Sequence, residues 1–370
     1  MAKILAWIIF LATFVLLAKS LFLGFYPDFN TQYYVPQIVL KGINPYAGSS
    51  MLYTPQVYPP TMFLLYYPFS LLPLSYASYL YVFLSFSSLF VSLYFLANYF
   101  EIKFFSTMNL VLMSFVLIFF PVKFTLGMGQ INLLLLMVLV VSLYFLKEKK
   151  YISSGMLIGI SIVLKLFPLL LPVLFLKPLN KKFFYGLIIT SIISSLLVLL
   201  FIPQKTVFQF FSILPSFVLS WKLDYYNQAV SGIVGRSFGV GHLAISIKTA
   251  FSLVVVIVVF FSVFKNLLVD SYTIALKFGI IIAANILINT FSWQHHFVWM
   301  IIPLYATFFY FRKKNFSKKY YGLLFISFLL MAGNVSNPTA LPTILRSHVF
   351  IGGMTLLLLD CYLLVRKPSH

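Results

Sequence analysis

The sequence has little charge overall and very few acids. Only 6 of its 370 residues are Asp or Glu, charged residues make up 9% and hydrophobic residues 62%. Soluble domains carry about 25% charged residues, and surface-to-volume scaling limits how much apolar surface a protein interior can hide. A water-soluble fold is therefore excluded, and lipid must be the solvent for most of the chain.

Cysteine and internal repeats are also scarce. The single Cys361 excludes an intramolecular disulfide and a cysteine-based zinc site. We find no soluble domain, no low-complexity tract and no obvious repeat, which counts against a transporter built from two related halves. The sequence predicts one transmembrane domain over residues 1–370.

Long apolar stretches dominate what is present. A membrane span needs roughly 20 apolar residues. The predicted spans are 4–23, 76–99, 105–123, 130–147, 183–202, 246–264, 272–291, 295–311, 320–335 and 346–365. Residues 60–72 are short and 152–176 are broken at Lys165-Leu166-Phe167-Pro168, so each is predicted to be a half-membrane element. The first stretch is too long for the apolar core of a signal peptide, and we expect it to be retained as a helix.

The net charge of +20 follows the positive-inside rule. With the N-terminus inside, the basic runs 147–150, 181–182 and 312–314 fall in cytoplasmic loops. This asymmetry predicts a multi-pass protein of the cell membrane with both termini cytoplasmic. Basic residues do not interleave with aromatics outside the apolar stretches, so membrane lipids are expected partners and nucleic acid is not.

The two long extracytoplasmic loops, 24–59 and 203–245, contain the two acids whose surroundings indicate a possible function. Asp28 and Asp224 each lie next to aromatic residues and amides. A carboxylate against aromatic surface at the membrane boundary is partly desolvated, which makes it a better proton acceptor near neutral pH. A loop charge or a helix cap is the alternative for both. The other acids are expected in ordinary loop positions. The exception is Asp360, which lies a few residues from Arg366 in the last predicted helix and is expected to have a structural or interfacial role, by snorkelling or pairing.

Several cations and amides complete the set of polar residues. Lys165 falls between two apolar segments, where an ammonium marks a functional site, such as one for phosphate, unless it snorkels to the surface. Arg236 could grip the same phosphate bidentately. His295 and His296 begin an outer helix and point about 100° apart, so one is expected at the phosphate or substrate and the other to pack. Gln130 and Asn132 suit hydroxyl recognition or a plain helix start.

In this order, the clusters resemble glycosyltransferase family 87 of the GT-C superfamily, over most of the chain from Asp28 to about Pro303. The family's motifs appear as Asp28, Gly42-Ile43-Asn44-Pro45-Tyr46, Tyr58-Pro59-Pro60, Gly129-Gln130-Ile131-Asn132, Lys165-Leu166-Phe167-Pro168, Asn227-Gln228-Ala229 with Arg236, and Trp293-Gln294-His295-His296. Ala229 replaces the usual Ser. Asn30 stands where many GT-C enzymes have a second acid, which puts a metal requirement in doubt, and we expect no cofactor.

The resemblance implies a GT-C-like helical bundle that works as a hexosyltransferase. It would move a hexose, mannose in this family, from a polyprenyl phosphate to a hydroxyl of a glycolipid or lipid-linked glycan on the extracytoplasmic face, with inversion. Asp28 is then expected to be the base, and Lys165, Arg236, His295 and His296 are expected at the donor phosphate. The expected sugar and acceptor contacts are Asn44, Tyr46, Tyr58, Gln130, Asn132, Asp224, Asn227 and Gln228.

Two other classes of function explain part of the pattern. A transporter or flippase of lipid-linked sugars would need polar residues on both faces of a central pathway, whereas this sequence gathers them on one side. A non-enzymatic scaffold explains the helices but not a lysine at membrane depth or acids in two outer loops. The sequence does not name the acceptor, the linkage position or the oligomeric state.

Overall fold

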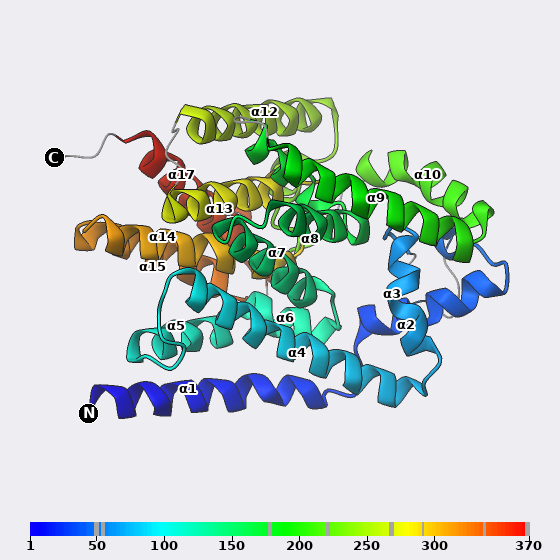
Figure 1. The fold of residues 1–370 in the computed structure, drawn as a ribbon. Helices are drawn as coiled ribbons and strands as arrows, with labels where there is room; N and C mark the ends of the chain where they lie inside the picture. Colours follow the sequence, from blue (N-terminus) through cyan, green and yellow to red (C-terminus); the bar gives the residue numbers. More distant parts are fainter. Residues whose placement is uncertain are drawn as a thin grey trace. The chain divides into compact units, whose positions relative to one another are not determined.

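A computed structural model gives the fold of the chain (Figure 1). It describes residues 1–47, 52, 56–176, 180–219, 223–265, 270–290, 292–335 and 338–366. Parts of both predicted outer loops, 48–51, 53–55 and 220–222, lie outside the described residues. The chain divides into two compact units, described separately below. Unit 1 comprises Met1–Ile118, Val122–Leu169 and Asn180–Ser220, and unit 2 comprises Phe119–Pro121, Leu170–Leu179 and Trp221–His370.

The described residues of unit 1 form ten α-helices, of which α6 begins with two residues of unit 2. They are α1 (Ala2–Ala18), α2 (Pro27–Leu40), α3 (Thr61–Ser70), α4 (Leu74–Tyr99), α5 (Thr107–Ile118), α6 (Phe120–Met128), α7 (Asn132–Lys147), α8 (Tyr151–Leu164), α9 (Lys181–Phe201) and α10 (Gln204–Leu219). The 3-10 turns η1 (Lys19–Phe22) and η2 (Pro45–Ala47) lie between them, and η3 (Phe167–Phe175) follows α8. The start of predicted loop 203–245 is therefore a 16-residue helix, α10.

Unit 2 holds the remaining helices. They are α11 (Val230–Phe238), α12 (His242–Lys265), α13 (Ser271–Ile288), α14 (Ile301–Lys313), α15 (Lys318–Ala332), α16 (Thr343–Arg346) and α17 (His348–Val365), with the 3-10 turns η4 (Gln294–Met300) and η5 (Pro338–Ala340). Helix α13 packs against α12, α14 and α17 and is the core of this unit. The described residues form no β-strand, and Asn227 and Trp293 pair in an isolated antiparallel bridge.

Six helices among the described residues are long and apolar enough to cross a membrane. They are Ala2–Phe22, Leu74–Tyr99, Lys181–Phe201, His242–Lys265, Ser271–Ile288 and His348–Val365. This confirms an all-helical, multi-pass membrane protein. The ten full spans are not confirmed, because the apolar helices within 130–147, 295–311 and 320–335 are only 16, 13 and 15 residues long.

The predicted span 105–123 is broken in two. Helices α5 and α6 meet at Phe119 with a bend of 53°. Pro121 explains the break, because proline has no backbone N–H and its ring clashes with the carbonyl one turn earlier. The two pieces together pass as one bent span or a re-entrant segment.

Two of the spans leave most of their apolar surface uncovered by protein. Only 17% of the apolar window of α9 and 11% of that of α12 is buried. Water-soluble proteins rarely expose apolar patches of this size. These faces therefore contact lipid, as the composition predicted.

Helix α8 lies beside α7 and α9, and small residues bring α8 and α9 into close contact (Figure 1). A Cβ on Gly155 would lie 2.1 Å from the Phe183 carbonyl oxygen, and one on Gly186 2.2 Å from that of Ile152. Such small residues let membrane helices approach at backbone distance. This packing holds the helix that ends next to Lys165.

The predicted break at Lys165 is confirmed. Helix α8 ends at Leu164, Lys165 is extended with φ −152° and ψ 109°, and a 3-10 segment begins at Phe167. Pro168 explains why α8 ends at Leu164, because proline has no N–H to donate and its ring clashes with the carbonyl of the residue four positions earlier. Lys165 therefore lies at the C-terminal end of α8, between this helix and the 3-10 segment.

Candidate functional site

Asp28 lies in the first turn of α2. Pro27 occupies the first helical position, for which its fixed φ is suited, and a carboxylate in the first turn is favoured by the helix dipole. The next residue, Phe29, is fully buried, with ring centroids 4.7 Å from Tyr81 and 6.0 Å from Tyr66. This aromatic anchor fixes the start of α2, so the position of Asp28 is set by helices α3 and α4.

Gly129 ends α6 and brings the Gly-Gln-x-Asn element against α2. Its φ is +67°, and the N–H groups of Gly129 and Gln130 donate back to Leu126 and Thr125 at 3.1 and 3.0 Å, a glycine helix cap. A Cβ here would lie 2.6 Å from the Cβ of Phe29. Both the backbone angle and the space require glycine, and the turn points Gln130 at Asp28.

Gly129→Ala is expected to lower the free energy of unfolding, whereas Gly127→Ala is the matched control. The left-handed backbone alone costs about 1–2 kcal/mol for a residue with a Cβ, and the clash with Phe29 adds to it. At Gly127 the nearest atom to a Cβ would be 3.6 Å away, an ordinary contact within the helix. Thermal unfolding of both variants in detergent measures the difference, and equal stability would show that the α2–α6 contact is loose.

One amide joins Asp28 to Tyr58. Gln130 Nε2 donates to Asp28 Oδ2 at 2.5 Å, and the Tyr58 hydroxyl donates to Gln130 Oε1 at 2.9 Å. Gln130 is 6% exposed, whereas Asp28 is half-buried. Burial raises the pKa of Tyr58, so its phenol remains a proton donor. Both ends of the Gln130 amide are therefore used in orienting the carboxylate.

The pKa of the Asp28 carboxyl group lies close to neutral pH. Burial raises its pKa to about 6, against the opposing effects of the Gln130 hydrogen bond and the positive charge of Lys165. Desolvation disfavours the ionised form and is the largest of the three causes. Above pH 6 the group is an anion of raised basicity, as a general base requires.

Lys165 belongs to the same cluster. It is 6% exposed, and its Nζ donates to Asn132 Oδ1 at 2.8 Å. The ammonium lies over the rings of Tyr58 and Phe167, 5.2 and 5.9 Å from their centroids. The structure thus brings together five of the residues singled out in the sequence: Asp28, Tyr58, Gln130, Asn132 and Lys165.

Asn44 and Tyr46 lie outside this cluster and form hydrogen bonds that hold one of its members, Tyr58. The Asn44 side chain accepts a hydrogen bond from the Tyr46 backbone N–H at 3.0 Å, as in an Asx turn. The Tyr46 hydroxyl donates to the Tyr58 carbonyl oxygen at 3.1 Å. Both side chains are bonded to the loop itself, and this geometry favours a role in holding Tyr58 over direct contact with substrate.

Sequence reasoning missed two further residues that hold Tyr58. The side-chain amides of Gln32 and Gln56 are buried and bond to each other at 3.2 and 2.7 Å. Gln56 Oε1 also accepts from the backbone N–H of Tyr58 at 3.0 Å. One signal was available, since Gln32 follows Asp28 by four residues and shares its helix face. The partner of Gln32 is 24 positions away, beyond any local pattern.

In unit 2, the Asn227-Gln228-Ala229 element pairs with the residues before His295. Gln228 N donates to Ser292 O at 2.8 Å, and Gln294 N donates to Tyr226 O at 3.0 Å. Asn227 Oδ1 accepts from Ser292 N at 2.9 Å, and Gln228 Nε2 donates to Tyr225 O at 2.6 Å. The two amide side chains, fully buried, therefore stabilise the junction of two family motifs.

Arg236 clamps the same loop. Its guanidinium donates to the carbonyl oxygens of Asp224 and Asn227 at 2.9 and 2.8 Å and to Ser347 Oγ at 2.8 Å. Burial, then the charge of Arg346, lowers the pKa of Arg236 to about 10, so it remains a cation at neutral pH. The Asp224 side chain itself is exposed. These hydrogen bonds hold the loop, and a contact of Arg236 with the donor phosphate stays a prediction.

His295 and His296 are both buried in η4, 5% and 2% exposed. Their ring centroids are 4.5 Å apart with planes at 81°, so the rings diverge as expected for adjacent residues. Within the described part of the chain, no three His, Cys, Asp or Glu side chains are grouped closely enough to hold a metal ion. The absence of a cofactor stays a prediction.

Asp360 does not snorkel to a surface, and it pairs with a neighbouring helix, which is a structural role. Asp360 is fully buried in α17 and accepts a hydrogen bond from Thr307 Oγ1 of α14 at 2.6 Å. Arg366 instead donates to the Tyr320 hydroxyl at 2.9 Å. The carboxyl faces a neighbouring helix within unit 2, where a threonine satisfies part of its hydrogen-bonding capacity.

The comparison with known families agrees with this arrangement of motifs. A family model described as "Glycosyltransferase family 87" matches residues 57–288, more than half of the chain. The chain belongs to glycosyltransferase family 87. A search of curated proteins gives no match. As a member of this family, the protein is a membrane glycosyltransferase, which requires a sugar donor and an acceptor.

The family match covers part of the candidate site of this glycosyltransferase. Tyr58, Gln130, Asn132 and Lys165 lie within the matched residues 57–288. Asp28 lies before them, so its assignment rests on its contact with the matched Gln130. His295 and His296 lie after the matched region.

Proposed function

We propose that this glycosyltransferase moves a hexose, mannose by family resemblance, from a polyprenyl phosphate to a hydroxyl of a glycolipid or lipid-linked glycan, with inversion. The observation that carries the proposal is the cluster of Asp28, Tyr58, Gln130, Asn132 and Lys165. It joins a carboxylate of raised basicity to a buried ammonium within one unit of the fold. These are the two charges that such a transfer needs.

Asp28 acts as the base in this proposal. It takes the proton of the acceptor hydroxyl as that oxygen attacks the anomeric carbon from the face opposite the phosphate. Gln130, held by Tyr58, orients the carboxylate and leaves its second oxygen to face the acceptor. The sequence predicted that Gln130 contacts the sugar or the acceptor. In this proposal Gln130 instead positions the base.

Lys165 stabilises the leaving group. The bond between the anomeric carbon and the phosphate oxygen breaks, and its electron pair stays on the polyprenyl phosphate, whose added charge the ammonium offsets. A phosphate is already a good leaving group, so no general acid is required. Asn132 and the rings of Tyr58 and Phe167 hold the ammonium in place.

The remaining assignments extend the proposal to the whole chain. We expect about ten full spans and two half-membrane elements in a single GT-C-like domain, with both termini cytoplasmic and the loops 24–59 and 203–245 contributing to an extracytoplasmic active site. Arg236, His295 and His296 stay predicted at the donor phosphate. Asp224, Asn227 and Gln228 stay predicted contacts of sugar or acceptor.

The proposal is tested by donor choice with the purified enzyme in lipid nanodiscs. Polyprenyl-phosphate mannose is expected to support transfer to an extract of endogenous lipid acceptors, whereas a nucleotide-linked mannose is not. Nuclear magnetic resonance of the product should show an α-linkage formed from a β-linked donor. Transfer from the nucleotide sugar alone would contradict the proposal, as would translocation of the lipid-linked sugar without any transfer.

The rate of transfer is expected to rise with pH through about 6. Asp28 has a raised pKa of about 6, so the base is protonated and inactive below that pH. Gln130→Met removes the hydrogen bond that lowers this pKa, and the rise should move to higher pH. The measurement is kcat/KM for the donor against pH for both proteins, and a rise that stays in place would remove Gln130 as the partner of the base.

A further inference from the structure

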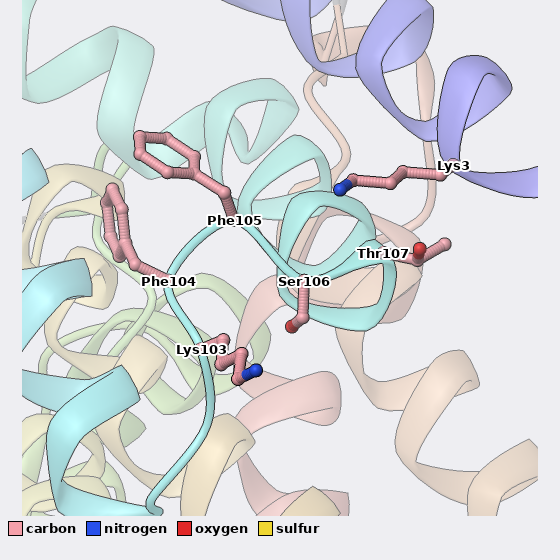
Figure 2. A pocket seen from close by; sticks show the side chains of 6 residues that line it. All are labelled: Lys3, Lys103, Phe104, Phe105, Ser106 and Thr107. Atoms are coloured by element: carbon pink, nitrogen blue, oxygen red, sulfur yellow. The ribbon is translucent and has the colours of Figure 1, made fainter.

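A pocket lies in unit 1, apart from the residues of the candidate site. It has a volume of about 480 Å³ and is lined by Lys3, Lys103, Phe104, Phe105, Ser106 and Thr107. Figure 2 shows Lys3 reaching from α1 toward the first turn of α5, with Lys103 on the loop just before that turn. No role in sugar transfer accounts for this pocket.

The charge of the pocket is positive. Two of its six lining residues are lysines and none is an acid. Glu101, two residues before Lys103, is engaged elsewhere, because its Oε1 lies 2.7 Å from Lys147 Nζ. Lys147 also donates to the Tyr99 carbonyl oxygen at 2.7 Å, which holds this ion pair at the C-terminal end of α4. The pocket therefore offers two cations to an anionic ligand.

The loop that carries Lys103 is fixed by its own hydrogen bonds. Ser106 N donates to Lys103 O at 2.9 Å, and Asn109 Nδ2 donates to Phe104 O at 2.8 Å. The Ser106 hydroxyl accepts from Asn109 N at 3.3 Å and caps α5. A loop held in this way is preorganised, so a ligand does not have to order it on binding.

Aromatic residues place the pocket at a membrane surface. Trp7 stacks on Phe105 with ring centroids 5.4 Å apart, and Phe105 is 54% exposed. Tryptophan is enriched where spans meet the headgroup layer. Lys3 is in the first turn of α1, at the end of a candidate span. Lysines at this level lie beside lipid headgroups, and anionic headgroups attract them.

We propose that this pocket binds the phosphate of an anionic phospholipid headgroup. Lys3 and Lys103 donate to the phosphate oxygens, and the hydroxyl of Thr107 is a further donor. Trp7 and Phe105 lie beside the first carbons of the acyl chains. A cavity of about 480 Å³ holds a phosphate together with a glycerol-sized headgroup. The site is independent of the sugar-transfer site and stands whether or not that function is correct.

The test compares lipid binding by native mass spectrometry of the full chain in detergent, with phosphatidylglycerol and phosphatidylcholine as probes. The wild type is expected to prefer phosphatidylglycerol. Lys3→Gln/Lys103→Gln should weaken that binding about 30-fold, since each lysine near an anionic headgroup contributes about fivefold to the affinity and the two contributions multiply. The control Lys149→Gln/Lys150→Gln removes the same charge from an exposed loop and should leave the preference intact.

Three outcomes would overturn the proposal. They are equal loss of phosphatidylglycerol in the two double variants, no preference over phosphatidylcholine in the wild type, and full competition by inorganic phosphate, which would make the ligand a free anion. The single variants Lys3→Gln and Lys103→Gln should each lose about fivefold. They keep the test decisive if the double variant does not fold.

Discussion

Asp28→Asn is expected to reduce kcat by about 10²–10⁴-fold, the contribution typical of a positioned general base. The amide keeps the size of the side chain and can still bond to Gln130, but it cannot take the acceptor proton. The affinity for the donor should change little, because the donor phosphate is assigned to Lys165. Initial rates with donor and acceptor lipids, together with donor binding, separate these effects.

Glu148→Gln is the matched control for the loss of a carboxylate. Glu148 is exposed in the loop after α7, away from the cluster of Asp28 and Gln130, and its substitution should leave the rate unchanged. Near-wild-type turnover by Asp28→Asn would remove Asp28 as the base. Loss of donor binding together with turnover would instead assign Asp28 to the binding of substrate.

Lys165→Met is expected to reduce kcat/KM for the donor by about 10²–10³-fold, the cost typical of removing one group that stabilises developing charge. Methionine retains much of the apolar stem that packs under Tyr58 and Phe167. The dependence of rate on acceptor concentration should change much less than its dependence on donor. Saturation curves for each substrate at fixed levels of the other measure the difference.

Lys123→Met tests whether loss of positive charge alone matters. Lys123 lies exposed on α6, in the same unit as Lys165. Wild-type kinetics are expected for this control. If Lys165→Met altered donor and acceptor dependence equally, the ammonium would be a structural partner of Asn132 and the phosphate assignment would fail.

Sequence patterns predicted the fold where the pattern is local. A lysine and a proline inside one apolar run predicted the break at Lys165, and the structure has it there. The break at Phe119 was missed although Pro121 signals it, because the proline lies inside an apolar run long enough to be predicted as one span. Hydropathy counts apolar residues and does not register which of them leave the helical conformation.

The candidate site was predictable by residue type but not by role. Asp28 and Gln130 stood out as polar residues in apolar surroundings, yet their 2.5 Å contact joins positions 102 residues apart. Asn44 and Tyr46 were expected at the substrate, and the structure bonds them to the loop that carries Tyr58. Family motifs mix residues that touch substrate with residues that hold them, and only long-range contacts separate the two.

The central claim is that Asp28 and Lys165 flank one reacting centre, with the ammonium at the donor phosphate. A cryo-electron microscopy structure of the Asp28→Asn variant with bound polyprenyl-phosphate mannose tests it most directly. The account predicts a phosphate oxygen at about 2.7–2.9 Å from Lys165 Nζ and the sugar's anomeric carbon facing position 28. A phosphate bound away from Lys165, with the sugar out of reach of position 28, would contradict it.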